Sequence, residues 1–142
     1  MKDENSRQSF PVENYNQYNY LKDFRSLDSW KRCRDVKLYF YNEILPRLPK
    51  KERYNLDIQI RKAAISITSN IAEGYGRYYF KEGIKFYRIS RASLYELKDH
   101  LMSCMDLNYI TTVQYEKGLK LIEVAKIVLN CFIRFVQRQS SS

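Results

Sequence analysis

Glycine and proline are scarce in this chain of 142 residues, which contains four Gly and three Pro. β-Sandwiches and β-barrels need many tight turns, and such turns favour both residues, so an all-β fold is disfavoured. No stretch of the sequence approaches the ~18 consecutive apolar residues of a membrane-spanning helix. Hydrophobic residues make up 44% and charged residues 29% of the chain, proportions typical of a globular domain. The balance favours long helices, and the length predicts a single domain.

Histidine and cysteine are also rare, and their placement excludes several chemistries. His100 is the one histidine, so a His-rich zinc site is excluded and a nucleophilic dyad has a single candidate base. Cys33, Cys104 and Cys131 are far apart and form no CxxC motif, so we expect three buried thiols rather than a zinc ribbon or redox site. We expect no metal and no cofactor. Without a disulfide framework or signal peptide, a reducing compartment and a cytoplasmic location are expected.

Positive charge is in excess. The chain has 25 Lys and Arg residues and 16 Asp and Glu residues, which give a formal net charge of +9 at pH 7 and a pI near 9.5. Such an excess in a small domain predicts an acidic partner, with nucleic acid first and an anionic membrane surface second. The pI alone does not distinguish nucleic acid from a membrane surface as the partner, so we next consider how the charges are distributed along the chain.

The two ends of the chain differ in composition from the rest. Residues 1–23 are rich in Asn, Gln, Ser and Tyr and show no sustained period, so we expect a flexible polar arm. Tyr15, Tyr18 and Tyr20 in this arm would be able to stack on bases or dock on a partner, although an ordinary disordered leader is the preferred interpretation. Residues 24–137 are predicted to form one four-helix bundle, and residues 138–142 a disordered tail.

The first two predicted helices cover about residues 26–45 and 56–75. Ser26 or Asp28 is expected to cap the first helix, and Pro46 to stop it, because proline cannot continue a helix. In the second helix, apolar residues recur at i, i+4, i+7 and i+11 from residue 60, as expected for one helical face. Gly74 and Gly76 are expected to end this helix in the left-handed conformation that glycine accepts.

The third predicted helix covers about residues 79–107, and the fourth begins after residue 110. Thr111 and Gln114 have the spacing of a capping box, in which each side chain satisfies a backbone N–H of the other residue. Short loops between all four helices predict an all-α, antiparallel up-down-up-down four-helix bundle. The apolar stripes are wider than the seam of an isolated coiled coil, which fits either a thick core or a second buried face used in self-association.

Two basic clusters are the candidate nucleic-acid-binding residues. Cations with this spacing bind phosphates by releasing counterions, and the alternative is an ordinary solvated helix face. We expect Arg88 to be partly buried by its aromatic and apolar neighbours. The first cluster is Arg77, Lys81, Lys85, Arg88 and Arg91, and the second is Lys50, Lys51, Arg53, Arg61 and Lys62.

Other polar residues are expected to have structural roles. Gly74, Gly76 and Gly83 follow a helix rather than a strand and lack the Walker spacing, so a phosphate loop is disfavoured. Glu73, Glu96 and Asp99 are predicted to form salt bridges rather than a catalytic pair of carboxylates. Ser69 and Asn70 are expected to hydrogen-bond inside the bundle or across an interface. His100 is expected to be a partly exposed structural histidine.

The segment from residue 60 to residue 101 resembles the signature of the 23S rRNA intervening-sequence proteins, which include the accessory variability determinants of diversity-generating retroelements. The run SITSNIAEGYGR at residues 66–77 is similar to the family's SIPxNIAEGxGR. Phe86, Arg88, Ser93, Leu94, Glu96 and Leu97 occupy places in its FxRxAxxSLxEL segment, and Phe24, Leu27 and Trp30 resemble its opening. Thr68 departs from the family's usual proline and suggests a straighter second helix. Gly83 and Lys98 also depart from the residues that the family usually has at these two positions.

The resemblance implies a function and an assembly. Family members form homopentameric barrels of four-helix bundles with a positively charged surface, and the retroelement members bind a reverse transcriptase and template RNA. We therefore expect a non-enzymatic scaffold whose partners are RNA or DNA, a reverse transcriptase and further copies of the chain. One alternative is an oligomeric protein-interaction module without nucleic-acid binding, and another is a protein encoded in an rRNA insert. A small hydrolase that uses Glu73 and His100 is a weaker alternative.

Overall fold

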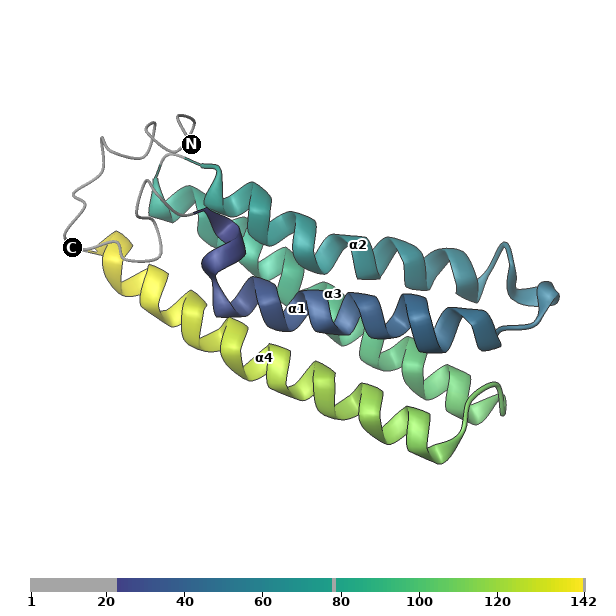
Figure 1. Ribbon diagram of the computed structural model, residues 1–142. Helices are drawn as coiled ribbons and strands as arrows, with labels where there is room; N and C mark the ends of the chain where they lie inside the picture. Colours follow the sequence, from purple (N-terminus) through teal and green to yellow (C-terminus); the bar gives the residue numbers. More distant parts are fainter. Residues whose placement is uncertain (1–22, 78, 142) are drawn as a thin grey trace.

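Four helices make up the computed structural model, which describes residues 23–77 and 79–141. They are α1 (Asp28–Tyr39), α2 (Leu56–Tyr75), α3 (Phe80–Asp106) and α4 (Thr112–Ser141) (Figure 1). None of the described residues lies in a β-strand, so the predicted all-α fold with four helices is confirmed. The predicted polar arm lies almost wholly outside the described residues, as does Ser142.

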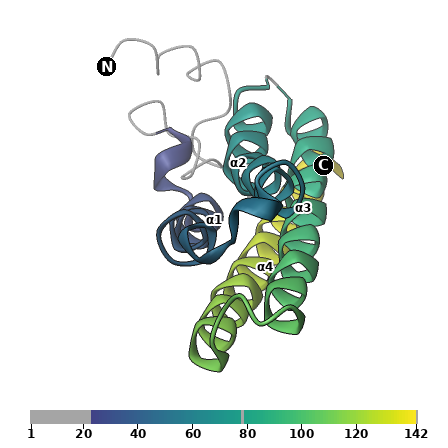
Figure 2. The ribbon, with the colours of Figure 1, turned by 90° about the vertical axis from the view of Figure 1, so that its right-hand side faces the viewer.

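The helices lie side by side and are joined by short connections. α2 packs against α1 and α3, and α4 packs against α3 and α1. The α1–α2 connection and the α3–α4 turn lie at one end of the bundle, and the α2–α3 connection lies at the other end, together with the last residues of α4 (Figures 1 and 2). Sequence segments that are far apart therefore meet at both ends.

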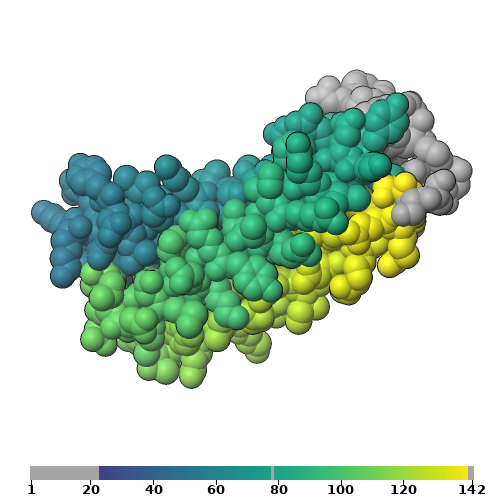
Figure 3. All heavy atoms as spheres, turned by 180° about the vertical axis from the view of Figure 1, so that it is seen from behind, coloured from purple at the N-terminus to yellow at the C-terminus, as the bar shows by residue number. Residues whose placement is uncertain are grey.

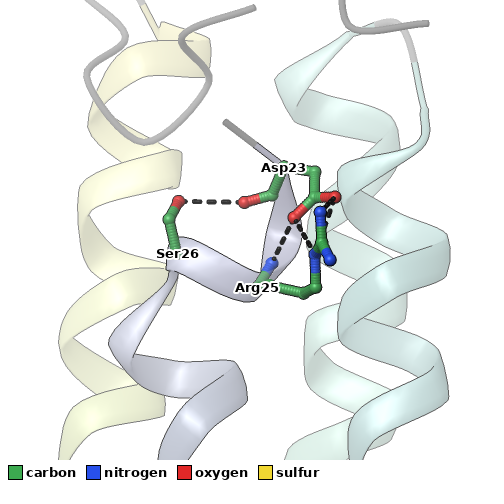
Figure 4. A network of polar contacts seen from close by, with 3 residues as sticks. All are labelled: Asp23, Arg25 and Ser26. Carbon is green, nitrogen blue, oxygen red and sulfur yellow. Dashed lines mark hydrogen bonds and ion pairs between the residues drawn. The ribbon is translucent and has the colours of Figure 1, made fainter. Parts of the chain in front are cut away.

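A 3₁₀ turn at Phe24–Ser26 precedes α1, and Asp23 caps it (Figure 4). The Asp23 carboxylate accepts hydrogen bonds from the backbone N–H and the guanidinium of Arg25 at 2.9 Å, and these bonds lower the pKa of Asp23. The predicted N-cap of α1 is wrong. Ser26 donates instead to the carbonyl of Asp23, while Leu27 occupies the N-cap position with no side-chain bond and Asp28 lies in the first turn.

After α1, the helix continues as a wider π-helical turn before it stops. Residues Phe40–Ile44 form a π-helical segment in which the N–H of Leu45 donates to the carbonyl of Phe40. A 3₁₀ turn at Leu45–Arg47 follows, and it contains Pro46, which has no N–H with which to continue the helix. The first helix therefore ends near Pro46, as the sequence predicts, but its last turns are not α-helical.

Gly74 and Gly83 allow α2 and α3 to approach closely. A Cβ atom at Gly74 would lie 2.6 Å from Cε1 of Tyr87 and 2.9 Å from the carbonyl oxygen of Gly83. The expected left-handed helix end is wrong, because no described glycine has a positive φ and Gly76 has a φ of −72°. The glycines are required here by packing rather than by backbone conformation.

The α3–α4 turn contains the one described non-glycine residue with positive φ, Asn108, at 62°. The N–H of Asn108 donates to the carbonyl of Met105, and the N–H of Tyr109 donates to that of Cys104, which together form a Schellman motif. The predicted capping box then begins α4. The backbone N–H of Gln114 donates to Oγ1 of Thr111 at 3.1 Å, and the Gln114 side chain accepts from the N–H of Thr111 at 2.9 Å.

The hydrophobic core runs between the four helices. Its fully buried members include Cys33, Val36, Phe40, Ile44, Ile60, Ile67, Ile71, Tyr87, Leu94, Leu97, Leu101, Cys104, Ile122, Leu129 and Val136. The expectation of three buried thiols is wrong for Cys131, which is exposed. The core-facing residues of α4 recur through Leu129 and Ile133, so position 131 falls on the outer side of this helix.

α4 is longer than the sequence predicts. It continues to Ser141 and so includes most of the segment predicted as a disordered tail. Gln137, Arg138 and Gln139 are compatible with a helix, and the Ser140 hydroxyl donates to the carbonyl of Gln137 at 2.9 Å. Across the described ranges, no helix has the length and apolar character needed to cross a membrane.

Candidate nucleic-acid interface

A row of three exposed cations lies on the first turns of α3. Lys81, Lys85 and Arg88 are spaced at i, i+4 and i+7, which places them on one side of the helix. None of the three forms an ion pair with another described residue. The expected partial burial of Arg88 is wrong, because the side chain is exposed while the neighbouring Tyr87 is directed into the core. We call Lys81, Lys85 and Arg88 the α3 row.

A groove borders this row where α2 ends and α3 begins. It has a volume of about 340 Å³ and is lined by Arg77, Lys81, Glu82, Lys85 and Phe86. Three of these five side chains are cations. The groove also lies beside the N-terminus of α3, where the helix dipole adds partial positive charge. We call it the basic groove.

Arg77 is held at the groove by two contacts. Its guanidinium forms an ion pair with Glu73 at 2.9 Å, and it lies 4.5 Å from the centre of the Phe86 ring. The ring thus joins the α2–α3 connection to α3 through a cation–π contact. Lys85 approaches the same ring at 5.8 Å. Glu73 therefore has the salt-bridge role expected from the sequence, and Arg77 is positioned by protein groups rather than free in solvent.

Arg91 is separated from the α3 row. It is half-buried, and its guanidinium donates to Oδ1 of Asn130 on α4 at 2.9 Å. Because it faces the α3–α4 contact, Arg91 acts in packing between these helices. The structure thus brings Arg77, Lys81 and Lys85 together, with Arg88 alongside, and leaves Arg91 outside the group.

The second predicted cluster lies at the opposite end of the bundle (Figure 1). Its members precede α2 or lie in the first two turns of this helix, and the remaining turns of α2 separate them from Arg77 by about 20 Å or more. Lys50, Lys51, Arg53 and Lys62 are exposed there. Arg61 forms an ion pair with Asp57 at 2.6 Å, which raises the pKa of the arginine, and its guanidinium lies 5.4 Å from the Tyr41 ring. The two clusters therefore do not form one continuous site on a single chain.

Asn70, Glu96 and His100 make side-chain contacts within their own helices. Asn70 donates to the carbonyl and hydroxyl oxygens of Ser66 at 3.0 and 2.9 Å, whereas Ser69 is exposed. Glu96 contacts Nε2 of His100 at 3.1 Å, a pairing within α3 that does not involve Glu73. Within the part of the chain that the structure describes, no three His, Cys, Asp or Glu side chains are grouped so that they could hold a metal ion.

Three residues of this region were not predicted from the sequence as site residues. Phe86 supports Arg77, Glu82 brings a carboxylate into the basic groove, and Tyr79 is 62% exposed just before α3. The sequence shows aromatic residues at the start of the predicted third helix. Their exposure, however, depends on how α2 and α3 pack.

Comparison with known proteins supports the family resemblance of residues 66–77, which lie at the end of α2 and in the α2–α3 connection. No curated protein matches the chain. The model of one protein family, described as 23S rRNA-intervening sequence protein, matches residues 25–130. This match covers α1, α2, α3 and more than half of α4, and it includes the glycines, Arg77 and the α3 row. The chain therefore belongs to the 23S rRNA-intervening sequence protein family.

Proposed function

We propose that this protein is a non-enzymatic scaffold that binds nucleic acid through the α3 row and the basic groove. The observation that carries the proposal is the exposure of Lys81, Lys85 and Arg88 on one side of α3, with no described ion pair to neutralise them. Three such cations attract a phosphate backbone and release its counterions on binding. Contacts of this kind hold a strand in place without reading its sequence.

The partner most consistent with this chemistry is RNA or DNA held for another protein. The finer proposal is an accessory role in a diversity-generating retroelement, with a reverse transcriptase and its template RNA as partners. A protein encoded in an rRNA insert is the second candidate within the same family. Both roles use the same phosphate contacts, and we propose that both take place in the cytoplasm.

We also propose that the up-down-up-down bundle is one subunit of a homopentameric ring. A half-exposed apolar stripe on α4 supports self-association: its members are Leu121, Val124, Val128, Cys131 and Phe135. They recur at alternating steps of three and four residues, the spacing of a helix seam that packs against another helix. In a ring, the α3 row would be repeated in every subunit, and the combined field would strengthen phosphate binding. This α4 stripe also favours the alternative of a protein-interaction module.

A triple substitution tests the nucleic-acid proposal. Replacing Lys81, Lys85 and Arg88 with Gln should weaken binding of RNA and DNA of any sequence. The slope of log K against log salt should flatten by about 0.7 to 0.9 for each phosphate that the variant no longer neutralises. Fluorescence anisotropy at four or more salt concentrations measures both quantities. Circular dichroism should remain unchanged, because exposed charges contribute little to stability.

The matched control removes the same charge elsewhere. Lys31, Lys117 and Lys120 are exposed on α1 and α4, and their replacement with Gln also lowers the net charge by three. This control should reduce binding only slightly, through the long-range field. Equal losses in the two variants, or unchanged binding by the α3 variant, would favour the protein-interaction module.

A further inference from the structure

A second group of exposed cations lies at the far end of the bundle, outside the α3 row and the basic groove. None of these residues forms an ion pair with another described residue. They lie on the α1–α2 connection and in the first two turns of α2. We call this group the far-end cluster, and its members are Arg47, Lys50, Lys51, Arg53 and Lys62.

The carboxylates of the same segments leave the far-end cluster positively charged. Glu52 is buried, and its carboxylate accepts a hydrogen bond from the Tyr109 hydroxyl at 2.6 Å. Asp57 is paired with Arg61, so its charge is already balanced. Glu43 is exposed in the π-helical segment that precedes the cluster, but the cations of the cluster outnumber it. The far-end cluster therefore attracts anions.

The part of α2 between the far-end cluster and the basic groove carries no cation. Residues 63–76 contain neither Lys nor Arg, and the Glu73 carboxylate among them is paired with Arg77 at 2.9 Å. From Lys62 to the end of α2 at Tyr75 the helix rises by about 20 Å. Figure 3 shows this separation, with the α1–α2 connection in blue at the left end and the start of α3 in teal towards the right.

The rest of α3 does not connect the two basic regions either. Beyond the α3 row its cations are Arg91, which is bound to Asn130, and Lys98, which is paired with Glu123 at 3.0 Å. The exposed acidic residues on these turns are Glu96, Asp99 and Asp106. Carboxylates repel phosphates, so a nucleic-acid backbone bound at the α3 row is not led along α3 to the far-end cluster.

We propose that each chain binds two separate segments of nucleic-acid backbone at once, one at the α3 row and the basic groove and the other at the far-end cluster, and so bridges two strands. The inference rests on the proposed function and adds to it a second phosphate site and a bridging activity. Both regions present unpaired cations, which bind phosphates without reading sequence, so both take the same class of ligand. The gap between them makes the two binding events independent.

The experiment counts the strands bound by each chain. Equilibrium dialysis at low salt with a labelled 6-nucleotide oligothymidylate gives the number of strands per chain at saturation, and this number does not depend on how many chains assemble. The full-length wild type should bind two strands per chain.

Two triple substitutions assign the strands to the two regions. Replacing Lys50, Lys51 and Arg53 with Gln removes three cations of the far-end cluster and should leave one strand per chain. The triple Gln variant of the α3 row should also leave one strand per chain, held at the opposite end. The matched control with Lys31, Lys117 and Lys120 replaced by Gln loses the same charge and should still bind two.

The outcomes separate this inference from the proposed function. One strand per wild-type chain, or two strands per chain in the far-end variant, overturns the inference while nucleic-acid binding stands. Failure of the wild type to bind the strand overturns the proposed function itself. If the far-end variant does not fold, Lys62→Glu takes its place, because it changes one exposed side chain of α2. It should weaken the binding of one of the two strands by about tenfold at low salt, and unchanged binding of both strands overturns the inference.

Discussion

At the scale of single residues, Gly74 and Gly83 bring α2 and α3 into backbone contact beside the basic groove. The ring of Tyr87 lies against both glycines: a Cβ atom would lie 2.6 Å from the ring at Gly74 and 3.2 Å from it at Gly83. A side chain at either position would therefore displace the ring or separate the helices. The position of the α3 row relative to Arg77 depends on this contact.

Gly74→Ala tests the contact. The added methyl group would overlap Tyr87 and the Gly83 carbonyl, so we expect a loss of about 1 to 3 kcal/mol in the free energy of unfolding. Urea denaturation followed by circular dichroism measures it. Gly76→Ala is the matched control, because its Cβ would lie 3.4 Å from the carbonyl of Glu73 in ordinary contact. Equal stability of the two variants would contradict the packing role of Gly74.

Glu52 and Tyr109 join the two connections at the far end of the bundle. The Tyr109 hydroxyl donates to Oε2 of Glu52 at 2.6 Å, and this bond lowers the pKa of Glu52 and raises that of Tyr109 to about 12. Asn55 and the N–H of Leu56 also donate to the Glu52 carboxylate. The carboxylate thus acts as an acceptor for groups on both connections.

Tyr109→Phe should lower the thermal unfolding temperature in a pH-dependent way. Because the folded pKa of Glu52 is lowered, the stabilisation is complete above the ordinary glutamate pKa and is lost as the pH falls through the folded value. The difference between wild type and variant should therefore be largest near neutral pH and shrink in acid. Thermal melts from pH 7 to pH 3 measure it. A difference that stays constant with pH would show that the lost bond does not involve ionised Glu52.

At the scale of elements, capping residues decide where α4 begins. Thr111 and Gln114 satisfy each other's backbone donors, and the Gln114 carbonyl accepts from the Tyr39 hydroxyl at 2.8 Å. The capping box therefore fixes the first turn of α4 and also its contact with α1. By contrast, α2 has no side-chain cap at Asn55 and is held mainly by its buried face.

Thr111→Ala should remove about 1 kcal/mol of stability, because the N–H of Gln114 loses its acceptor. Denaturant unfolding measures the change. Thr112→Ala is the control, since Thr112 is an exposed neighbour inside the first turn and should change stability by less than about 0.5 kcal/mol. A larger effect at position 112 than at 111 would contradict the assignment of the cap.

At the scale of the whole molecule, the distribution of charge and apolar surface favours an assembly. The two basic clusters lie at opposite ends of the bundle, so one chain presents two separate positive regions. The α4 stripe lies along the outer side of one helix, with Ile127 beside it. Packing copies of the chain through this stripe would bury apolar surface and repeat both basic regions around the assembly.

Val124→Lys combined with Ile127→Lys should dissociate the proposed pentamer. These side chains are 38% and 64% exposed in the single chain, so their replacement should leave helical content unchanged. Light scattering should then give a mass near the 17.1 kDa of one chain, against about five times this mass for the wild type. Val113→Lys, at a position 74% exposed in the first turn of α4, is the control and should keep the larger mass. A wild-type mass of a single chain would overturn the pentamer.

The sequence by itself determined the number of helices, most of their boundaries and the start of α4. These features depend on local interactions: the helical period of apolar residues, Pro46 as a stop, and the three-residue spacing of Thr111 and Gln114. The residue run that marks the family is also local. The α3 row was predictable for the same reason, since residues at i, i+4 and i+7 share one side of any helix.

Only the tertiary structure decided which of the predicted cations share a site. The side chain of Arg91 is held by Asn130 on another helix, whereas Arg77 is brought to Lys81 and Lys85 across the α2–α3 connection. The roles of Gly74 and Cys131 likewise depend on what each residue faces. These properties arise where segments distant in sequence meet, and the spacing of residues along one chain carries no direct record of such contacts.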